Sequence, residues 1–163
     1  TAVALHKKWR WGANVTLSQN KIHSFTEYIF DYDINDYYQV QHGKTDVSFS
    51  PNVIAGSQLS YTPIPALEIT WLSKFVGKQY LDNTSSEDRI IESYNTNDIR
   101  IKWDVKTNWS KGISLTLLVN NVLNEWYSSN GFTYGYRAGG HVQENFYYPQ
   151  AGRNFLAGVS LKF

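Results

Sequence analysis

Residues 132–148, FTYGYRAGGHVQENFYY, carry the densest set of side chains that could bind a ligand. Tyr134, Tyr136, Arg137 and His141 bring aromatic faces, a guanidinium and an imidazole together within a short segment. Aromatic rings stack on a ligand, while hydroxyl, guanidinium and imidazole groups hydrogen-bond to it. These four are candidate ligand-contacting residues. The competing interpretation is an aromatic loop that packs on neighbouring loops or on lipid.

Other reactive residue types lack the spacing that chemistry requires. The chain has no cysteine, which excludes a disulfide scaffold, a thiolate metal site and a cysteine nucleophile. His6, His23, His42 and His141 lie on separate segments without ligand spacing. No Gly-x-Ser-x-Gly setting for a serine nucleophile occurs. The acidic stretch 82–88, DNTSSED, is interpreted as a solvated loop rather than a cation site. The sequence therefore predicts no catalytic residue, no metal site and no cofactor.

Composition narrows the class of protein further. The chain has 163 residues and a net charge of +1, and its basic residues are not clustered, so nucleic acid is not expected as a partner. No apolar run of about 18 residues is present, which argues against a transmembrane helix or a retained targeting segment. Aromatic residues reach 16%. Because the chain lacks methionine, we expect it to begin inside a longer product.

The elements that must position these residues are strands. In residues 96–106 charged and apolar side chains alternate, with Arg100 and Lys102 on one face and Ile101 and Trp103 on the other. The same period of two recurs along the chain, and no segment has a convincing helical period. The predicted strands cover about 8–22, 46–62, 66–80, 95–107, 112–125 and 153–163.

Short and long connections alternate between these strands. Tight turns are predicted at 63–66 and 108–111, and long loops at about 23–45, 81–94 and 126–152. All tight turns therefore lie at one end of an up-and-down antiparallel sheet. Outer-membrane barrels have this asymmetry, with short periplasmic turns and long extracellular loops.

Alternation alone does not separate a membrane barrel from a soluble lipocalin-like barrel or a β-sandwich. Strand length and a charged opposite face favour the membrane. Aromatic residues near strand ends also favour it, because Trp and Tyr prefer the membrane–water interface. The predicted girdle residues are Trp9, Trp11, Tyr61, Trp103, Trp126 and Tyr127.

Six strands do not close a barrel, since known outer-membrane barrels begin at about eight strands. One solution is that residues 25–40, FTEYIFDYDINDYYQV, add a hairpin and complete an eight-strand barrel that acts as an adhesin or structural protein. The other is that the chain is part of a larger barrel. The lack of methionine favours the larger barrel.

Two motifs near the end carry a resemblance to a known family. Asn120, Asn121, Leu123, Asn124 and Tyr127 match an N-N-L-F/L-N-x-x-Y element. The final strand matches a P-G/A-x-x-F-x-x-G pattern that ends in an aromatic residue, through Pro149, Gly152, Arg153, Asn154, Phe155, Gly158 and Phe163. The chain thus resembles the C-terminal segment of a TonB-dependent outer-membrane receptor, especially the Bacteroidetes-type members.

This resemblance implies a role and a setting. The chain would form about the last six strands of a 22-stranded barrel, with the plug domain absent from these residues. The whole receptor would sit in the outer membrane of a Gram-negative bacterium and import a ferric siderophore, haem or cobalamin with energy from the TonB complex. Phe155 and Phe163 would form the C-terminal signal for the barrel-assembly machinery. The expected partners are the rest of the barrel, the plug, TonB, that machinery and the lipid bilayer. The motifs do not specify a substrate.

Overall fold

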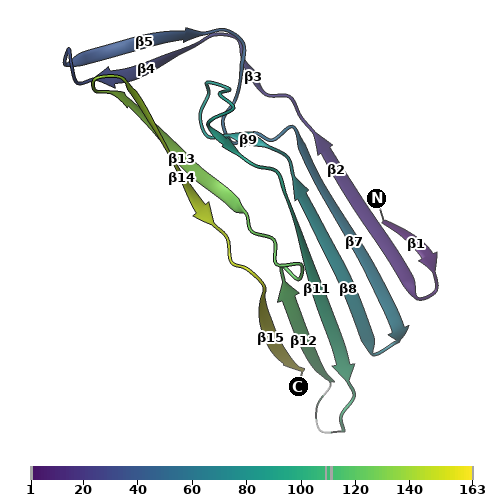
Figure 1. Ribbon diagram of the computed structural model, residues 1–163. Coiled ribbons are helices and arrows are strands. Elements are labelled where there is room, and N and C mark those ends of the chain that lie inside the picture. The colour runs from purple at the N-terminus through teal and green to yellow at the C-terminus, as the bar shows by residue number, and fades with distance from the viewer. Residues whose placement is uncertain (1, 109, 111, 163) are drawn as a thin grey trace.

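The computed structural model describes residues 2–108, 110 and 112–162, and this part of the chain contains no helix. Its main feature is one antiparallel sheet, here called the wall, with the strand order β1-β2-β7-β8-β11-β12-β15. The wall strands are β1 (Ala2–His6), β2 (Trp9–Leu17), β7 (Val53–Ile64), β8 (Leu67–Val76), β11 (Tyr94–Val105), β12 (Gly112–Asn120) and β15 (Asn154–Lys162). Figure 1 shows them side by side, with β1 and β15 at the two margins. The predicted all-β antiparallel meander is confirmed.

The register of the wall explains how the alternating sequence folds. One row across six strands joins Trp11, Leu59, Trp71, Ile99, Val119 and Phe155 as direct partners. The neighbouring row joins Arg10, Ser60, Thr70 and Arg100. Since successive strand residues point to opposite faces, the apolar positions of all strands gather on one face and the charged positions on the other. These are called the apolar face and the polar face below.

The strands differ from the predicted ranges in two ways. The wall has a seventh strand, β1, which the sequence did not predict. Four strands are also shorter at the loop end, where β2 ends at Leu17, β7 begins at Val53, β8 ends at Val76 and β12 ends at Asn120. The earlier end of β12 has a local cause, because Asn121 has a φ of 48°, which breaks the extended conformation.

Tight connections lie at one end of the wall. Lys7 and Lys8 form the turn before β2, and Pro65 and Ala66 form the turn before β8. Residues 109 and 111 of the turn predicted at 108–111 lie outside the described residues. The connections at the opposite end are long, so the alternation of short and long connections extends to β1.

The long connections contain strands of their own. These are β3 (Lys21–Ile22), β4 (Phe25–Asp31), β5 (Asp36–His42), β6 (Thr45–Asp46), β9 (Gln79–Tyr80), β10 (Ile90–Ile91), β13 (Ser128–Arg137) and β14 (His141–Pro149). Four of them form a second sheet, here called the loop sheet, in the order β14-β13-β4-β5. Residues 25–40 do form a hairpin, but it pairs with β13 in the loop sheet and adds no strand to the wall. The eight-strand barrel built from this hairpin is not observed.

The buried apolar side chains lie at the loop end of the molecule, where the wall strand β8 ends. Among the described residues, the buried large apolar side chains are Ile29, Val76, Leu81 and Ile91. The wall is a single layer, so its stability in isolation cannot come from a core between two sheets. An environment on its apolar face must supply that burial.

Candidate functional site

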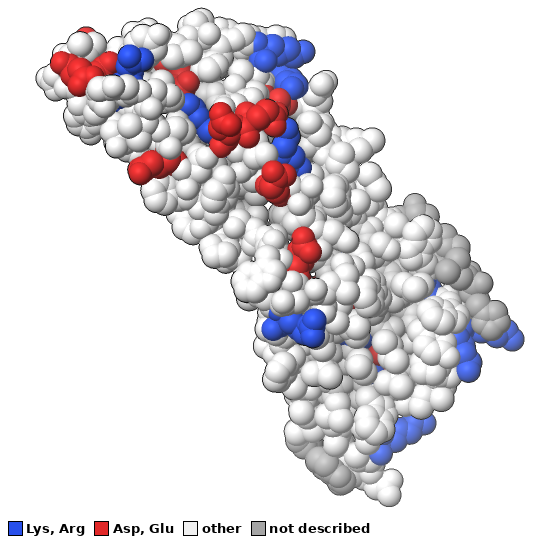
Figure 2. Space-filling view, viewed as in Figure 1, with Lys and Arg blue, Asp and Glu red and all other residues white. Residues whose placement is uncertain are grey.

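The apolar face of the wall carries no charged side chain on β2, β7, β8, β11, β12 or β15. Nothing in the described chain covers it: Val15 is 65% exposed and Val159 66% exposed. Figure 2 shows charged residues gathered over the loop hairpins and sparse over the middle of the wall. A monomer in water does not tolerate so large an apolar surface, whereas lipid hydrocarbon would cover it.

The few polar groups on the apolar face bond to one another. The Trp71 Nε1–H donates to Ser73 Oγ at 2.9 Å and to Asn97 Oδ1 at 3.1 Å. The Trp11 Nε1–H donates to Ser57 Oγ at 3.0 Å. A polar group in hydrocarbon is costly unless it has a partner. Because these polar groups bond to one another, they can lie on a face whose surroundings are apolar.

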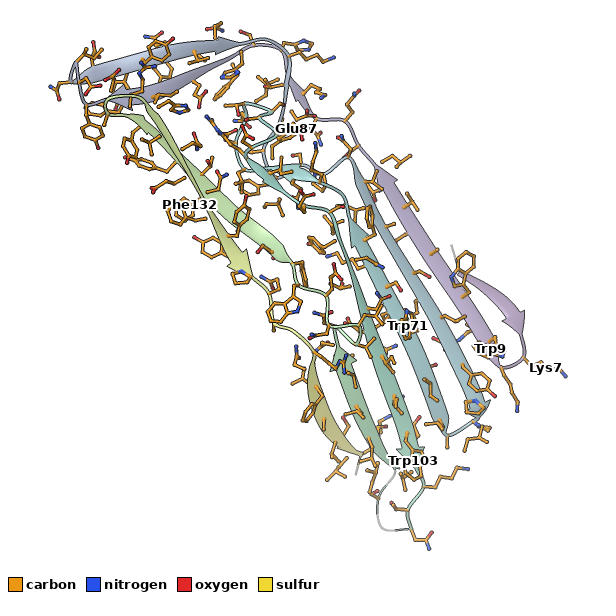
Figure 3. The ribbon with its side chains drawn as sticks, viewed as in Figure 1. Lys7, Trp9, Trp71, Glu87, Trp103 and Phe132 are labelled. Carbon is orange, nitrogen blue, oxygen red and sulfur yellow. The ribbon has the colours of Figure 1, made fainter. Side chains whose placement is uncertain are left out.

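Four predicted girdle residues lie on the apolar face, and two lie elsewhere. Trp9 and Tyr61 stack with ring centroids 4.3 Å apart near the turn end, where Trp103 also lies (Figure 3). Trp11 lies two residues after Trp9 on β2, further from the turn end. Trp126, in the loop after β12, is 81% exposed. Tyr127 stacks at 4.4 Å on Tyr94, a polar-face residue, so its position differs from that of the four residues on the apolar face.

The polar face is charged and hollowed. On the same six strands it carries the basic residues Arg10, Lys74, Arg100, Lys102 and Lys162 and the acidic residues Glu68, Asp98 and Asp104. A hollow of about 700 Å³ is lined mostly by residues of this face. A soluble calyx would place apolar residues around its hollow. The observed arrangement is instead that of a hydrated lumen.

The family-type motif residues form a turn that joins β12 to the start of β15. Asn121 is buried, its Nδ2–H donates to the carbonyls of Glu125 and Ala151 at 2.9 and 3.2 Å, and its Oδ1 accepts from the Glu125 N–H at 2.8 Å. Asn124 Oδ1 accepts from the Arg153 N–H at 2.9 Å. Both asparagines have positive φ, 48° and 58°. Asparagine tolerates this conformation, so the motif has a structural explanation.

The loop sheet has two unlike faces. One face presents aromatic rings across all four strands, namely Tyr28, Phe30, Tyr37, Phe132, Tyr134, Tyr136, Phe146 and Tyr148. Neighbouring rings touch, as in the stacked pair Phe132–Phe146 at 4.7 Å. The opposite face packs on the 81–93 loop, where a Cβ on Gly131 would meet the Leu81 side chain at 3.0 Å. Sequence reasoning missed the β4–β5 part of this surface.

The four candidate ligand-contacting residues divide between these faces. Tyr134 and Tyr136 lie on the aromatic face with ring centroids 5.6 Å apart, and a hydrogen bond with Tyr32 raises the pKa of Tyr134. Arg137 and His141 belong to the opposite face and are direct partners in the hairpin. The structure therefore joins the two tyrosines and separates them from the two basic residues.

Arg137 already has partners within the chain. Its Nε–H donates to Asp31 Oδ2 at 2.9 Å, and its guanidinium lies 4.5 Å from the centre of the Tyr38 ring. These contacts join β13 to both strands of the β4–β5 hairpin. Arg137 therefore links the β13–β14 hairpin to the β4–β5 hairpin.

A second link between loops is centred on Arg89, a buried residue that sequence reasoning did not single out. Its Nη1–H groups donate to Glu27 Oε1 at 2.5 Å and Asp82 Oδ2 at 2.8 Å. Glu27 Oε2 also lies 2.8 Å from His42 Nε2. Burial opposes the charge on Arg89, but the two carboxylates outweigh it and raise the pKa of the guanidinium. This network fixes β4 against the 81–93 loop.

The acidic stretch 82–88 is engaged by neighbouring side chains. Asp82 pairs with Arg89, and Glu87 accepts hydrogen bonds from Lys78 Nζ at 2.7 Å and from the Tyr80 hydroxyl at 2.8 Å. These bonds, the Lys78 bond first, lower the pKa of Glu87. No group of three or more acidic or histidine side chains arranged to hold a metal ion occurs in the described part of the chain.

The expected C-terminal signal consists of Phe155 and Phe163, and the structure describes the first of them. Phe155 lies on the apolar face of β15, is 75% exposed, and pairs with Val119. Phe163 lies outside the described residues. None of the described residues forms a helix long and apolar enough to cross a membrane.

Comparisons with known proteins complete this description. No protein-family model matches the chain, and no curated protein is significantly similar in sequence. Solved structures do match. The siderophore receptor PiuA from Acinetobacter baumannii gives a TM-score of 0.61 at 14% identity, over 97% of this chain and 20% of that chain.

Two further structures give the same result. A mutant of the ferric enterobactin receptor PfeA from Pseudomonas aeruginosa matches with a TM-score of 0.59 at 16% identity, over 99% of this chain and 21% of that one. The ferric yersiniabactin uptake receptor FyuA from Yersinia pestis matches with 0.55 at 18% identity, over 97% and 21%. The chain thus spans about a fifth of the length of the structures it matches. At these identities the likeness establishes the fold, and the chain has the fold of part of a siderophore receptor.

Proposed function

We propose that the chain is the C-terminal part of the barrel of a TonB-dependent outer-membrane receptor. The whole receptor imports a scarce metal chelate, such as a ferric siderophore, haem or cobalamin, with energy from the TonB complex. The barrel makes and breaks no bond, so the protein is a transporter and not an enzyme. The sequence motifs and the shared fold support this proposal together.

The observation that carries the proposal is the charge-free apolar face of a single-layer wall. A lipid bilayer would bury such a face while the opposite, charged face stays in contact with water. A soluble calyx would need the apolar face around the hollow, and a β-sandwich would need a second layer over it. The outer membrane of a Gram-negative bacterium is the setting in which barrels of this kind occur.

The loop sheet is the proposed site of ligand contact. Tyr134 and Tyr136 lie in a continuous aromatic surface with Tyr32, whose ring is 5.8 Å from that of Tyr136. Exposed rings of this kind offer stacking surfaces with hydroxyl tips to a bound chelate. Arg137 and His141 act through this surface only if the loops rearrange, since they belong to its opposite face.

The partners follow from the proposed role. The margins β1 and β15 would pair with the remaining strands of the barrel, because unpaired sheet edges invite association. The plug would occupy the lumen and transmit the pull of TonB. The barrel-assembly machinery would recognise the final strand through Phe155 and Phe163.

Uptake by cells tests this function. A strain that lacks the parent gene is supplied with the intact gene, and the accumulation of radiolabelled iron is followed with a panel of ferric siderophores and haem, and of labelled cobalamin. We expect one of these ligands to accumulate only with the intact gene and an active TonB complex. Uptake that is unchanged by loss of TonB would contradict the proposed mechanism.

The aromatic surface has its own test in the same strain. Replacing Tyr134 and Tyr136 together by alanine should weaken uptake, while replacing the similarly exposed Tyr147, which belongs to the opposite face of the hairpin, should change it less. Equal losses would argue against a special role for the aromatic face.

A further inference from the structure

Glu144 is the one charged residue among the strand positions that make up the aromatic face of the loop sheet. It lies on β14 directly opposite Tyr134 on β13, and Phe132 and Tyr136 are its diagonal neighbours. Its side chain is exposed, and its carboxylate makes no ion pair or hydrogen bond with any described residue. The carboxylate is therefore available to a ligand that lies on the surrounding rings.

The aromatic face offers no positive charge to a ligand. None of its positions on β4, β5, β13 or β14 is a Lys, Arg or His. Arg137 and His141 belong to the opposite face, and Arg137 is already paired with Asp31. The remaining polar positions of the aromatic face are neutral, namely Thr26, Gln39, Gln41 and Asn130. An anionic ligand would find no opposite charge on this surface.

The exposed rings favour a cation for the same electrostatic reason. Tyr134 and Tyr148 are 47% and 51% exposed, so a ligand can reach them. The face of an aromatic ring carries negative charge density, which attracts a cation and repels an anion. An ammonium group beside Glu144 would contact both the carboxylate and the ring of Tyr134.

The charge of the loops as a whole acts in the same direction. The three long loops, residues 18–52, 77–93 and 121–153, contain eleven Asp or Glu residues and six Lys or Arg residues. Figure 2 shows acidic side chains gathered over this end of the molecule. Four of the six basic residues are held in ion pairs with carboxylates, namely Lys21, Lys78, Arg89 and Arg137. Such an excess of negative charge raises the local concentration of cations and lowers that of anions.

Burial of the aromatic face against an apolar partner would not explain Glu144. A carboxylate that leaves water without a compensating positive charge loses a large free energy of hydration. Contact with hydrocarbon, or with an apolar part of another loop, would therefore be opposed by Glu144. A ligand that brings its own positive charge removes this cost, because the two charges pair on contact.

We propose that the aromatic face selects a ferric chelate of positive net charge, whose ammonium group pairs with Glu144 and lies against the ring of Tyr134. The apolar part of the chelate rests on the neighbouring rings. This inference rests on the proposed function and deepens it, because it gives the charge class of the ligand and the residue that recognises it.

Binding of chelates that differ in charge tests the inference in the full receptor in isolated outer membranes. A linear ferric trihydroxamate with a free amine is positively charged, and the same chelate with its amine acetylated is neutral. A ferric tricatecholate serves as the anionic probe. The dissociation constants of the three radiolabelled chelates are measured for the intact receptor and for the variant Glu144→Gln, which removes the charge and keeps the shape.

We expect the intact receptor to bind the amine chelate about tenfold more tightly than the acetylated one, and the tricatecholate most weakly. Glu144→Gln should bring the first two affinities together by weakening only the amine chelate. Glu92→Gln is the matched control, because Glu92 is an exposed carboxylate in the loop after β10 and not on the aromatic face. This variant should keep the preference.

The possible results separate the inference from the proposed function. Equal affinities for the amine and acetylated chelates, or tightest binding of the tricatecholate, would overturn the inference and leave a chelate transporter. A preference that Glu92→Gln lowers as much as Glu144→Gln would remove the role of Glu144. Uptake of haem or cobalamin alone would also overturn the inference while the transporter stands. If no ligand accumulates through the intact receptor, the proposed function itself fails.

Discussion

Leu117 and Thr116 are neighbours in the sequence that face opposite surroundings. Leu117 pairs with Ile101 and Ala157 on the apolar face, and Thr116 pairs with Lys102 on the polar face. Placing a charge on the lipid side of a barrel near mid-membrane costs about 2–4 kcal/mol. Leu117→Arg should lower the free energy of unfolding of the full receptor in lipid by that amount, measured by denaturant titration.

The matched variant Thr116→Arg should be nearly neutral, because its side chain enters a hydrated lumen. Equal losses for the two variants would show that the faces are assigned wrongly.

Asn121 is the residue on which the turn after β12 depends. It combines a positive φ with hydrogen bonds to Glu125 and Ala151. Leaving buried backbone groups unsatisfied costs about 1–3 kcal/mol. Asn121→Ala should therefore destabilise the barrel and should raise the hydrogen exchange of the 125–127 and 151–153 amides.

Asn121→Gly separates the effect of the positive φ from that of the side-chain hydrogen bonds, because glycine accepts the positive φ but makes no side-chain bond. Its stability should lie between those of the natural protein and the alanine variant. A glycine variant as stable as the natural protein would show that the side-chain bonds contribute nothing.

At the scale of elements, the β4–β5 hairpin is held by a few side chains. Its backbone pairing with β13 is limited to Tyr136 with Phe30 and Arg137 with Asp31. Arg89 adds the buried contacts to Glu27 and Asp82. Removing one partner of a buried ion pair costs about 3–5 kcal/mol, because the other charge stays buried.

Arg89→Met should therefore loosen the hairpin, which stays linked to β13 through Arg137, without affecting the wall. Hydrogen exchange should rise over 25–42 and stay unchanged over β7 and β8. Lys78→Met is the control, since its pair with Glu87 is exposed and should matter little. A general rise over the wall would contradict the idea of a locally held hairpin.

Six strands of the wall could be predicted from the sequence, whereas β1 and the loop sheet could not. Clean alternation, as in Arg100, Ile101, Lys102 and Trp103, arises where each face of a strand keeps one kind of surroundings along its whole length. The β4 strand alternates Glu27, Tyr28, Ile29 and Phe30, with charged and apolar residues on one face, because that face packs on another loop. When one face of a strand carries both charged and apolar residues, the sequence shows no alternation with a period of two.

The contacts within the candidate site could likewise be predicted only in part from the sequence. Tyr134 and Tyr136 were identified from their types and spacing, and they do lie together. Arg137 finds its partner Asp31 more than a hundred residues away, through a parallel pairing of loop strands that no local pattern indicates. For the same reason the sequence did not reveal Arg89 or the part of the aromatic face on β4 and β5.

At the scale of the whole molecule, we propose that the final strand takes part in assembly of the barrel. The final strand pairs along its length with β12, from Asn154 with Asn120 to Lys162 with Gly112. We expect deletion of Phe163 in the full receptor to reduce the amount inserted in the outer membrane, with the ligand affinity of the inserted fraction unchanged. Quantitative immunoblotting of membrane fractions and ligand binding per inserted molecule measure the two quantities.

The control for the Phe163 deletion is the deletion of a single residue elsewhere in the chain. Removing a residue from the exposed turn Gly139–Gly140 changes the chain length equally but leaves the final strand intact. If both deletions reduced insertion alike, the final aromatic residue would have no special role in assembly.

The most direct test of the membrane wall uses single cysteines along β11 of the full receptor in lipid, since this chain has no cysteine of its own. Spin labels at positions 99–104 report collisions with oxygen, which partitions into lipid, and with a water-soluble nickel complex. Labels at Ile99, Ile101 and Trp103 should favour oxygen, and labels at Arg100, Lys102 and Asp104 should favour nickel. A reversed pattern, or accessibility without a period of two, would contradict a lipid-facing wall.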